Sequence, residues 1–169
     1  GTQGESSTAN GSDVMKFDNN EPDHIYQEFE VTPNANYQIE VEVGFKANAG
    51  KSNPASLEFR VLAGTGYDSG YTPTYYTETT AFPQDGYGYS SVAQTEVEAN
   101  NLMIKVLNNP DDTSYIKYIL NFNSGANNSV ALFARGIGGL ATGSSDNERY
   151  GYSSGDEEIR IDNLVITAL

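Results

Sequence analysis

Tyrosines crowd two glycine-rich stretches of this 169-residue chain, from residue 64 to 91 and from residue 136 to 156. A phenol ring offers a flat apolar face for stacking on a sugar ring, and its hydroxyl adds a hydrogen-bonding group at low rotamer cost. Long stretches without a predicted element are usually functional or disordered, and the aromatic content argues against disorder. The alternative is that many of these rings plug the ends of the fold. The candidates for stacking are Tyr75, Tyr76, Tyr87, Tyr89 and Tyr152.

Cationic residues are few, nine against 23 acidic ones. Several are expected on the polar faces of strands, where they could gather to hold sugar hydroxyls, a carboxylate or a sulfate. The alternative is ordinary cross-strand pairing, such as Arg60 with Glu40 or Glu42, which contributes less than about 1 kcal/mol when exposed. The candidate cations are Arg60, Lys105, Arg135 and Arg149.

The last strand places a carboxylate and an amide side by side, Asp162 and Asn163, where β-branched residues would be preferred. A carboxylate in a closing strand needs a partner, and a bound cation is one candidate. The other interpretation is a surface aspartate at a bend of the strand.

Recognisable catalytic patterns are missing from the sequence. The only histidine, His24, follows Asp23 in a turn, and a lone histidine is more often a surface residue than a general base. Glu157 and Glu158 are adjacent, so in a strand they would point to opposite faces and could not flank one bond. No nucleophile elbow, zinc signature or phosphate-binding glycine loop is found. We therefore expect that the chain is not an enzyme.

Short alternating stretches, separated by turns rich in Gly, Asn, Asp and Pro, must position these residues. Residues 37–46 alternate most clearly, with apolar side chains on one face and polar ones on the other. No stretch carries a long apolar face of helical period, so no substantial helix is expected. The number and spacing of the strands predict an all-β, two-sheet antiparallel β-sandwich. Strands are expected at residues 14–17, 25–31, 37–46, 57–62, 102–107, 115–122, 130–135 and 158–166.

Charge and composition narrow the function classes. The formal net charge is −14, which repels nucleic acid and anionic lipid, and no segment reaches transmembrane length. These features suit a secreted or cell-surface domain. Cysteine is absent, so neither a disulfide framework nor thiol chemistry is available. Residues 1–12 are predicted to be a linker or the trimmed edge of a larger protein, and residues 13–169 a single domain.

Three segments carry motifs with a characteristic spacing. Residues 25–39 are similar to a Q-x-V-x-V-x-P-x-T-x-Y-x-L run. Residues 115–125 are similar to a W-x-x-Y-x-L-x-F-x-x-G run, with Tyr115 in place of the tryptophan. Residues 160–164, Arg-Ile-Asp-Asn-Leu, are similar to a closing x-I-D-N/D-V strand. Together the three segments resemble the jelly-roll carbohydrate-binding modules of families four, sixteen and twenty-two, and the similarity spans roughly residues 12 to 169.

The resemblance implies a jelly-roll sandwich that binds a polysaccharide or oligosaccharide without catalysis. Such a module targets an appended glycoside hydrolase or polysaccharide lyase, and an acidic, marine or plant cell-wall glycan is one candidate ligand. The resemblance also implies a structural Ca²⁺ held by Asp162 with an acidic residue near the start, for which Glu5 is the candidate. A second hypothesis is a structural or adhesin β-sandwich domain of a bacterial surface protein.

Overall fold

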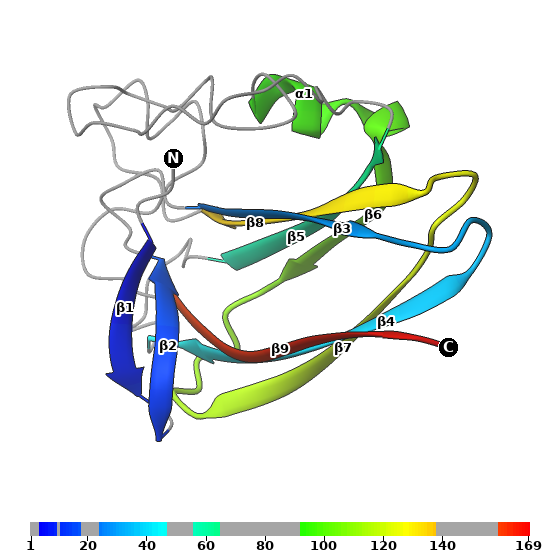
Figure 1. The fold of residues 1–169 in the computed structure, drawn as a ribbon. Coiled ribbons are helices and arrows are strands. Elements are labelled where there is room, and N and C mark those ends of the chain that lie inside the picture. Colours follow the sequence, from blue (N-terminus) through cyan, green and yellow to red (C-terminus); the bar gives the residue numbers. More distant parts are fainter. Residues whose placement is uncertain (1–3, 10, 18–23, 47–55, 65–91, 138–158) are drawn as a thin grey trace.

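The computed structural model describes residues 4–9, 11–17, 24–46, 56–64, 92–137 and 159–169. Its strands form two antiparallel sheets packed face to face, which confirms the predicted all-β jelly-roll sandwich (Figure 1). The five-stranded sheet has the order β1 (Gly4–Ala9), β2 (Ser12–Phe17), β9 (Ile159–Ala168), β4 (Asn36–Phe45) and β7 (Tyr115–Asn123). The four-stranded sheet has the order β3 (His24–Glu30), β8 (Ser129–Ile137), β5 (Ser56–Ala63) and β6 (Asn101–Leu107).

The core lies between the two sheets and follows the alternation of the sequence. The five odd-numbered residues of β4 from Tyr37 to Phe45 are all buried, as predicted, and they face apolar side chains of β5 such as Phe59. The Tyr37 ring stacks on Phe122 at 5.2 Å between centroids, so Tyr37 packs in the core as predicted. Burying each large apolar side chain contributes roughly 1.5 to 3 kcal/mol to folding.

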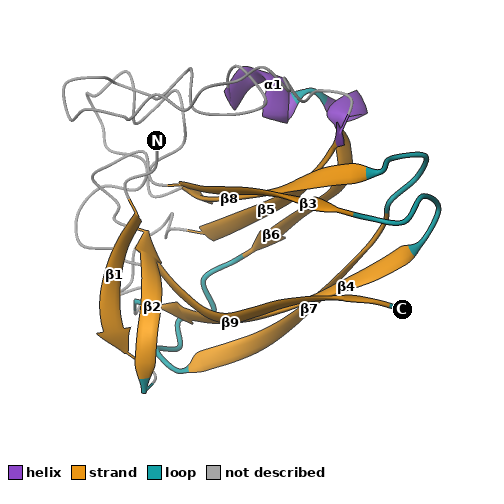
Figure 2. Ribbon diagram, viewed as in Figure 1, coloured by secondary structure: helices purple, strands orange, loops and turns teal. Residues whose placement is uncertain are grey.

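A short helical segment crosses the outside of the four-stranded sheet. It comprises α1 (Val92–Glu96) and the 3-10 turn η2 (Glu98–Asn100), and it leads directly into β6. Figures 1 and 2 show α1 on the side of this sheet that faces away from the five-stranded sheet. This segment, residues 92–101, is called the strap below.

The linker interpretation of residues 1–12 needs correction, because Gly4–Ala9 is strand β1, whereas the alternative of a trimmed edge of a larger protein stays a prediction. It pairs antiparallel with β2 from Gly4 opposite Phe17 to Ala9 opposite Ser12. Residues 4–9 do not alternate between apolar and polar types, so the periodicity of apolar residues could not predict this strand. The turn signal was present, because the strands are joined by the Asn10-Gly11 dipeptide that two-residue hairpins favour, and Gly11 has a φ of +80°.

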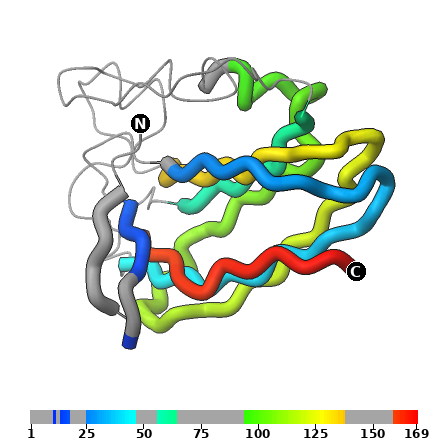
Figure 3. Tube along the Cα trace, viewed as in Figure 1, coloured from blue at the N-terminus to red at the C-terminus, as the bar shows by residue number. Residues whose placement is uncertain are grey.

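The closing strand β9 lies between β2 and β4 (Figure 3). Its first residues complete the core through the buried side chains of Ile159 and Ile161. Strand β2 covers only the beginning of β9, from Ile159 to Ile161. Strand β3 is at the edge of the other sheet. Beyond Ile161, the second half of β9 therefore faces β3 across the open side of the sandwich.

Candidate functional site

The outer face of the four-stranded sheet is buried along its two central strands, β5 and β8, although alternation predicted that it would be exposed to water. Across β5 and β8, Glu58 is in register with Arg135, Arg60 with Phe133, and Leu62 with Ala131. All six are buried; Arg60 is 8% exposed, Arg135 5% and Phe133 0%. The expectation that Arg60 and Arg135 lie on an exposed polar face is therefore wrong. We call these six residues the covered face.

Three charged residues of the covered face form one ion cluster around Glu58. Arg60 donates two hydrogen bonds to the Glu58 carboxylate, from Nε to Oε1 at 2.7 Å and from Nη2 to Oε2 at 3.1 Å. Arg135 donates from Nε to Glu58 Oε1 at 3.1 Å and from Nη2 to Glu96 Oε1 at 2.7 Å. The sequence suggested Glu40 or Glu42 as partners of Arg60, but the partner is two residues away on the same face of its own strand.

The cluster fastens the strap to the sheet. Arg60 Nη1 donates to the carbonyl of Thr95 at 3.0 Å, and the Asn101 amide donates to the same carbonyl at 2.8 Å. Thr95 is fully buried, whereas Glu96 and Val97 beside it are exposed. Over residues 94–101, where its side chains are described, the strap is thus held by polar contacts and by the Arg135–Glu96 ion pair.

Burial alone would raise the pKa of Glu58, but the hydrogen bond from Arg60 and the charges of Arg135 and Arg60 outweigh it and hold the pKa below its ordinary value of 4.5. A depressed carboxyl pKa adds stability that is complete above the unfolded pKa and lost as the pH falls through the folded pKa. A carboxylate kept ionised by two arginines suits a structural ion cluster rather than a general acid.

This shift predicts a pH dependence. The difference in unfolding free energy between the native chain and Glu58→Gln should shrink as the pH falls through the Glu58 pKa, because a protonated Glu58 resembles glutamine. Urea unfolding of both proteins from about pH 7 to about pH 3 measures the difference. A difference that stays constant over this range would contradict the ionised cluster.

Of the other predicted contact residues, the structure describes Lys105, which is not part of this cluster. Lys105 is exposed on the edge strand β6. Lys117 pairs with Glu40 at 3.1 Å on the exposed face of the five-stranded sheet. The other candidate contacts, Tyr75, Tyr76, Tyr87, Tyr89, Tyr152 and Arg149, lie outside the described residues.

Asp162 and Asn163 form a β-bulge in β9. Glu42 is in register with Asp162 and Glu40 with Val165, so β9 has one residue more than β4 over this interval. Asn163 adopts a φ of +50°, a left-handed conformation that asparagine tolerates better than β-branched residues. Its backbone N–H donates to Asp162 Oδ1 at 2.8 Å, and its amide donates to Glu42 Oε2 at 3.1 Å. The unusual pair is thereby explained by backbone conformation.

The bulge gives a prediction that separates backbone strain from a lost contact. Asn163→Ala and Asn163→Gly both remove the hydrogen bond to Glu42, but only alanine strains the left-handed backbone. We expect the glycine variant to be more stable by about 1 kcal/mol. Urea unfolding measures this, and an alanine variant as stable as the glycine variant would argue against a left-handed residue at 163.

The predicted calcium ligands, Asp162 and Glu5, are on strands that are not neighbours. Glu5 on β1 is in register with Lys16 on β2, which is in register with Arg160 on β9, so strand β2 lies between Glu5 and β9. Calcium requires six to eight oxygen ligands. The described part of the chain contains no group of three or more acidic or histidine side chains that could hold a metal. These residues alone do not complete a site, and calcium binding stays a prediction that a lowered melting temperature on chelation would test.

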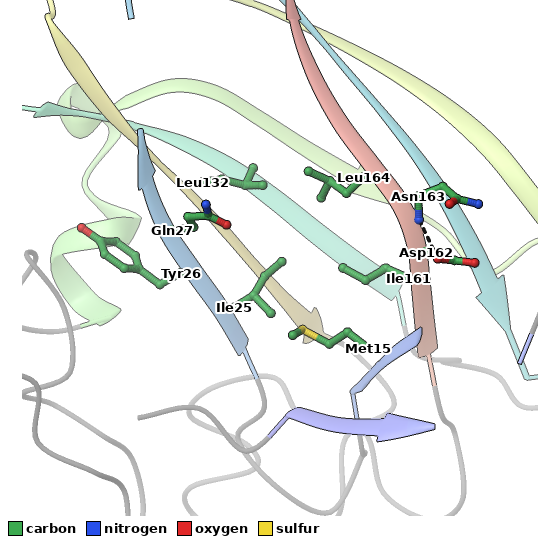
Figure 4. Close-up of a pocket in the computed structure, with 9 residues that line it drawn as sticks. All are labelled: Met15, Ile25, Tyr26, Gln27, Leu132, Ile161, Asp162, Asn163 and Leu164. Atoms are coloured by element: carbon green, nitrogen blue, oxygen red, sulfur yellow. Dashed lines mark hydrogen bonds between the residues drawn. The ribbon is translucent and has the colours of Figure 1, made fainter. Parts of the chain in front are cut away.

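A cleft opens between the sheets where β3 faces the second half of β9. Its volume is about 420 Å³, and Figure 4 shows the side chains of Ile25, Leu132, Ile161 and Leu164 converging on it. A second cavity of about 350 Å³ shares Gln27, Leu132 and Leu164 with the first. We call the two together the intersheet cleft. Ligand pockets of this size usually have mostly apolar walls with a few polar groups.

The polar residues of the cleft lie at its rim. Gln27 is exposed, and Tyr26 turns to the other side of β3, where its hydroxyl donates to Glu28 at 2.7 Å. The side chains of Asp162 and Asn163 point away from the converging apolar side chains (Figure 4). Sequence analysis missed this cleft, because alternation indicates which face of a strand is apolar but not where the two sheets stand apart.

Neither a protein-family model nor a curated protein sequence matches this chain. Solved structures do match it. A CBM4 structure aligns with 99% of this chain and 79% of its own at a TM-score of 0.52 and 7% identity. A family 16 carbohydrate-binding module aligns with 99% of this chain and 86% of its own chain, at a TM-score of 0.52 and 11% identity. The xylan-binding CBM22-1 domain from Paenibacillus barcinonensis aligns with 99% of this chain and 81% of its own chain, at a TM-score of 0.49 and 13% identity. The chain therefore has the jelly-roll β-sandwich fold found in carbohydrate-binding modules of families 4 and 16.

Proposed function

We propose that this chain is a non-catalytic carbohydrate-binding module that attaches an appended glycoside hydrolase or polysaccharide lyase to its polysaccharide outside the cell. The observation that carries the proposal is the shared jelly-roll fold, which aligns with two carbohydrate-binding structures over 99% of the chain. Within the described residues, no helix is long and apolar enough to cross a membrane.

The predicted residues that remain in the proposed contact set have two roles, stacking on sugar rings and hydrogen bonding to sugar hydroxyls. Tyr75, Tyr76, Tyr87, Tyr89 and Tyr152 supply stacking surfaces, and Lys105 and Arg149 bind sugar hydroxyls. Arg60 and Arg135 are left out of the contact set because both are buried and engaged with Glu58. Their role is to hold the strap over the covered face.

Affinity electrophoresis through gels that contain neutral or acidic polysaccharides tests the proposal. At least one polysaccharide should retard the native chain. In the Tyr75→Ala and Tyr76→Ala variants, the loss of one stacked ring should weaken binding about two- to tenfold, which corresponds to roughly 0.5 to 1.5 kcal/mol.

The matched controls are Tyr75→Phe and Tyr76→Phe, which keep the ring and remove only the hydroxyl. They should bind more tightly than the alanine variants. If no polysaccharide retards the native chain, the proposed function is wrong. If the phenylalanine and alanine variants lose the same affinity, these rings do not stack on the glycan.

A further inference from the structure

The intersheet cleft differs chemically from a site for a bare sugar ring. The side chains that converge on it, including Ile25, Ile161 and Leu164, are aliphatic (Figure 4). A sugar ring carries hydroxyls around its whole edge, and burying them among aliphatic side chains would leave them without hydrogen-bond partners. Water in such a cleft has equally few partners, so an apolar group displaces it favourably.

The charges around the cleft exclude an anionic ligand. Among the described residues that line the two cavities there is no lysine or arginine, whereas Asp162 lines one and Glu30 lines the other. The chain as a whole carries a formal net charge of −14. A free carboxylate or sulfate would therefore meet repulsion without a compensating cation among these described residues.

The far end of the cleft suits a flat or extended apolar group. Phe29 and Tyr37 line the second cavity, and both rings contact Phe122, with centroids at 6.4 Å and 5.2 Å. Gln27 lines both cavities, and its exposed side-chain amide offers two N–H donors to an acceptor such as an ester carbonyl. The cleft thus combines an uncharged apolar interior with an amide placed at its rim.

From this geometry we propose that the intersheet cleft binds a neutral acyl group carried as an ester on the polysaccharide. The acyl chain or ring lies among Ile25, Leu132 and Leu164, the Gln27 amide donates to the ester carbonyl, and the sugar remains outside. This inference rests on the proposed function, because the ester is recognised as a substituent of the bound glycan. It makes the chain selective for esterified over de-esterified forms of the same polysaccharide.

The two methionines of the chain provide a direct test. Met15 lines the cleft, whereas Met103 is on β6 and packs against the core. The full chain, labelled with ¹³C at the methionine methyl groups, is titrated with methyl ferulate, with ferulate anion and with feruloylated arabinoxylan before and after alkaline removal of its esters. The Met15 resonance should shift with both esters and Met103 should stay unmoved. The ferulate anion should bind at least about tenfold more weakly than its methyl ester.

Two variants confirm the location. Met15→Glu adds a carboxylate to the cleft and Gln27→Leu removes its amide donors, so both should reduce the preference for the esterified glycan. Both are checked for unchanged thermal unfolding. Lys117→Ala, on the exposed face of the five-stranded sheet, is the control and should keep the preference.

The outcomes separate this inference from the proposed function. If gels that contain esterified and de-esterified arabinoxylan retard the chain equally and Met15 does not move, the ester site is wrong and glycan binding stands. If methyl ferulate shifts Met15 but no polysaccharide retards the chain, the acyl site stands and the carbohydrate-binding function is wrong. A shift of Met103 together with Met15 would also overturn the assignment to this cleft.

Discussion

Glu58→Gln is expected to lower the free energy of unfolding at neutral pH by about 3 to 5 kcal/mol, the usual result of removing one partner from a buried ion pair. Glu58 is the common acceptor of Arg60 and Arg135, and all three are buried. Glutamine keeps the size of the side chain but leaves two buried guanidinium groups without the carboxylate between them. Urea unfolding at neutral pH measures the loss.

The matched control is Glu40→Gln, which breaks the exposed Lys117–Glu40 pair at 3.1 Å. Exposed pairs contribute little, so a change of less than about 1 kcal/mol is expected there. Because small domains have about 5 to 15 kcal/mol of stability, the Glu58 variant should still fold at low denaturant. Equal and small effects of the two substitutions would show that Glu58 is not a buried anchor.

Phe133→Ala is expected to lower the free energy of unfolding by about 3 to 5 kcal/mol, as much as truncating an aromatic residue in the core between the sheets. Phe133 is on the covered face, is 0% exposed and has the Arg135 guanidinium 5.9 Å from its ring centre. Truncation would leave a cavity on this face and remove the aromatic support of Arg135. Thermal or urea unfolding measures the loss.

Ile119→Ala is the control for Phe133, because Ile119 is 54% exposed on the outer face of the five-stranded sheet. A change within about 0.5 kcal/mol is expected for such a surface position. If Phe133→Ala is as mild as the control, the four-stranded sheet is open to solvent on that side. Its arginines would then return to the set of candidate glycan contacts.

Much of the fold was predictable because alternation reports directly which face of a strand is buried. It placed Tyr37 and its neighbours in the core, and the structure confirms this along the whole of β4. The same rule failed on β5 and β8, because both of their faces are buried. Glu58 and Arg60 look like solvent-facing residues in the sequence, but the structure buries both of them and bonds Arg60 to the strap.

The candidate site was less predictable, for two physical reasons. The pairing of Glu58 with two arginines depends on the register of β5 and β8, which sequence alone does not give. The intersheet cleft depends on how far β2 extends along β9, and its pairing stops at Ile161. The bulge at Asn163 was noticed through its unusual residue types, but the sequence could not distinguish a left-handed backbone from a metal ligand.

The central claim, that this jelly-roll domain binds polysaccharide, is tested most directly by applying the purified native chain to an array of neutral and acidic plant and marine polysaccharides. We predict saturable binding to a restricted set of these glycans, with esterified forms bound more tightly than the same glycans after alkaline treatment. No saturable binding to any glycan on the array, by a chain that shows cooperative unfolding, would contradict the claim.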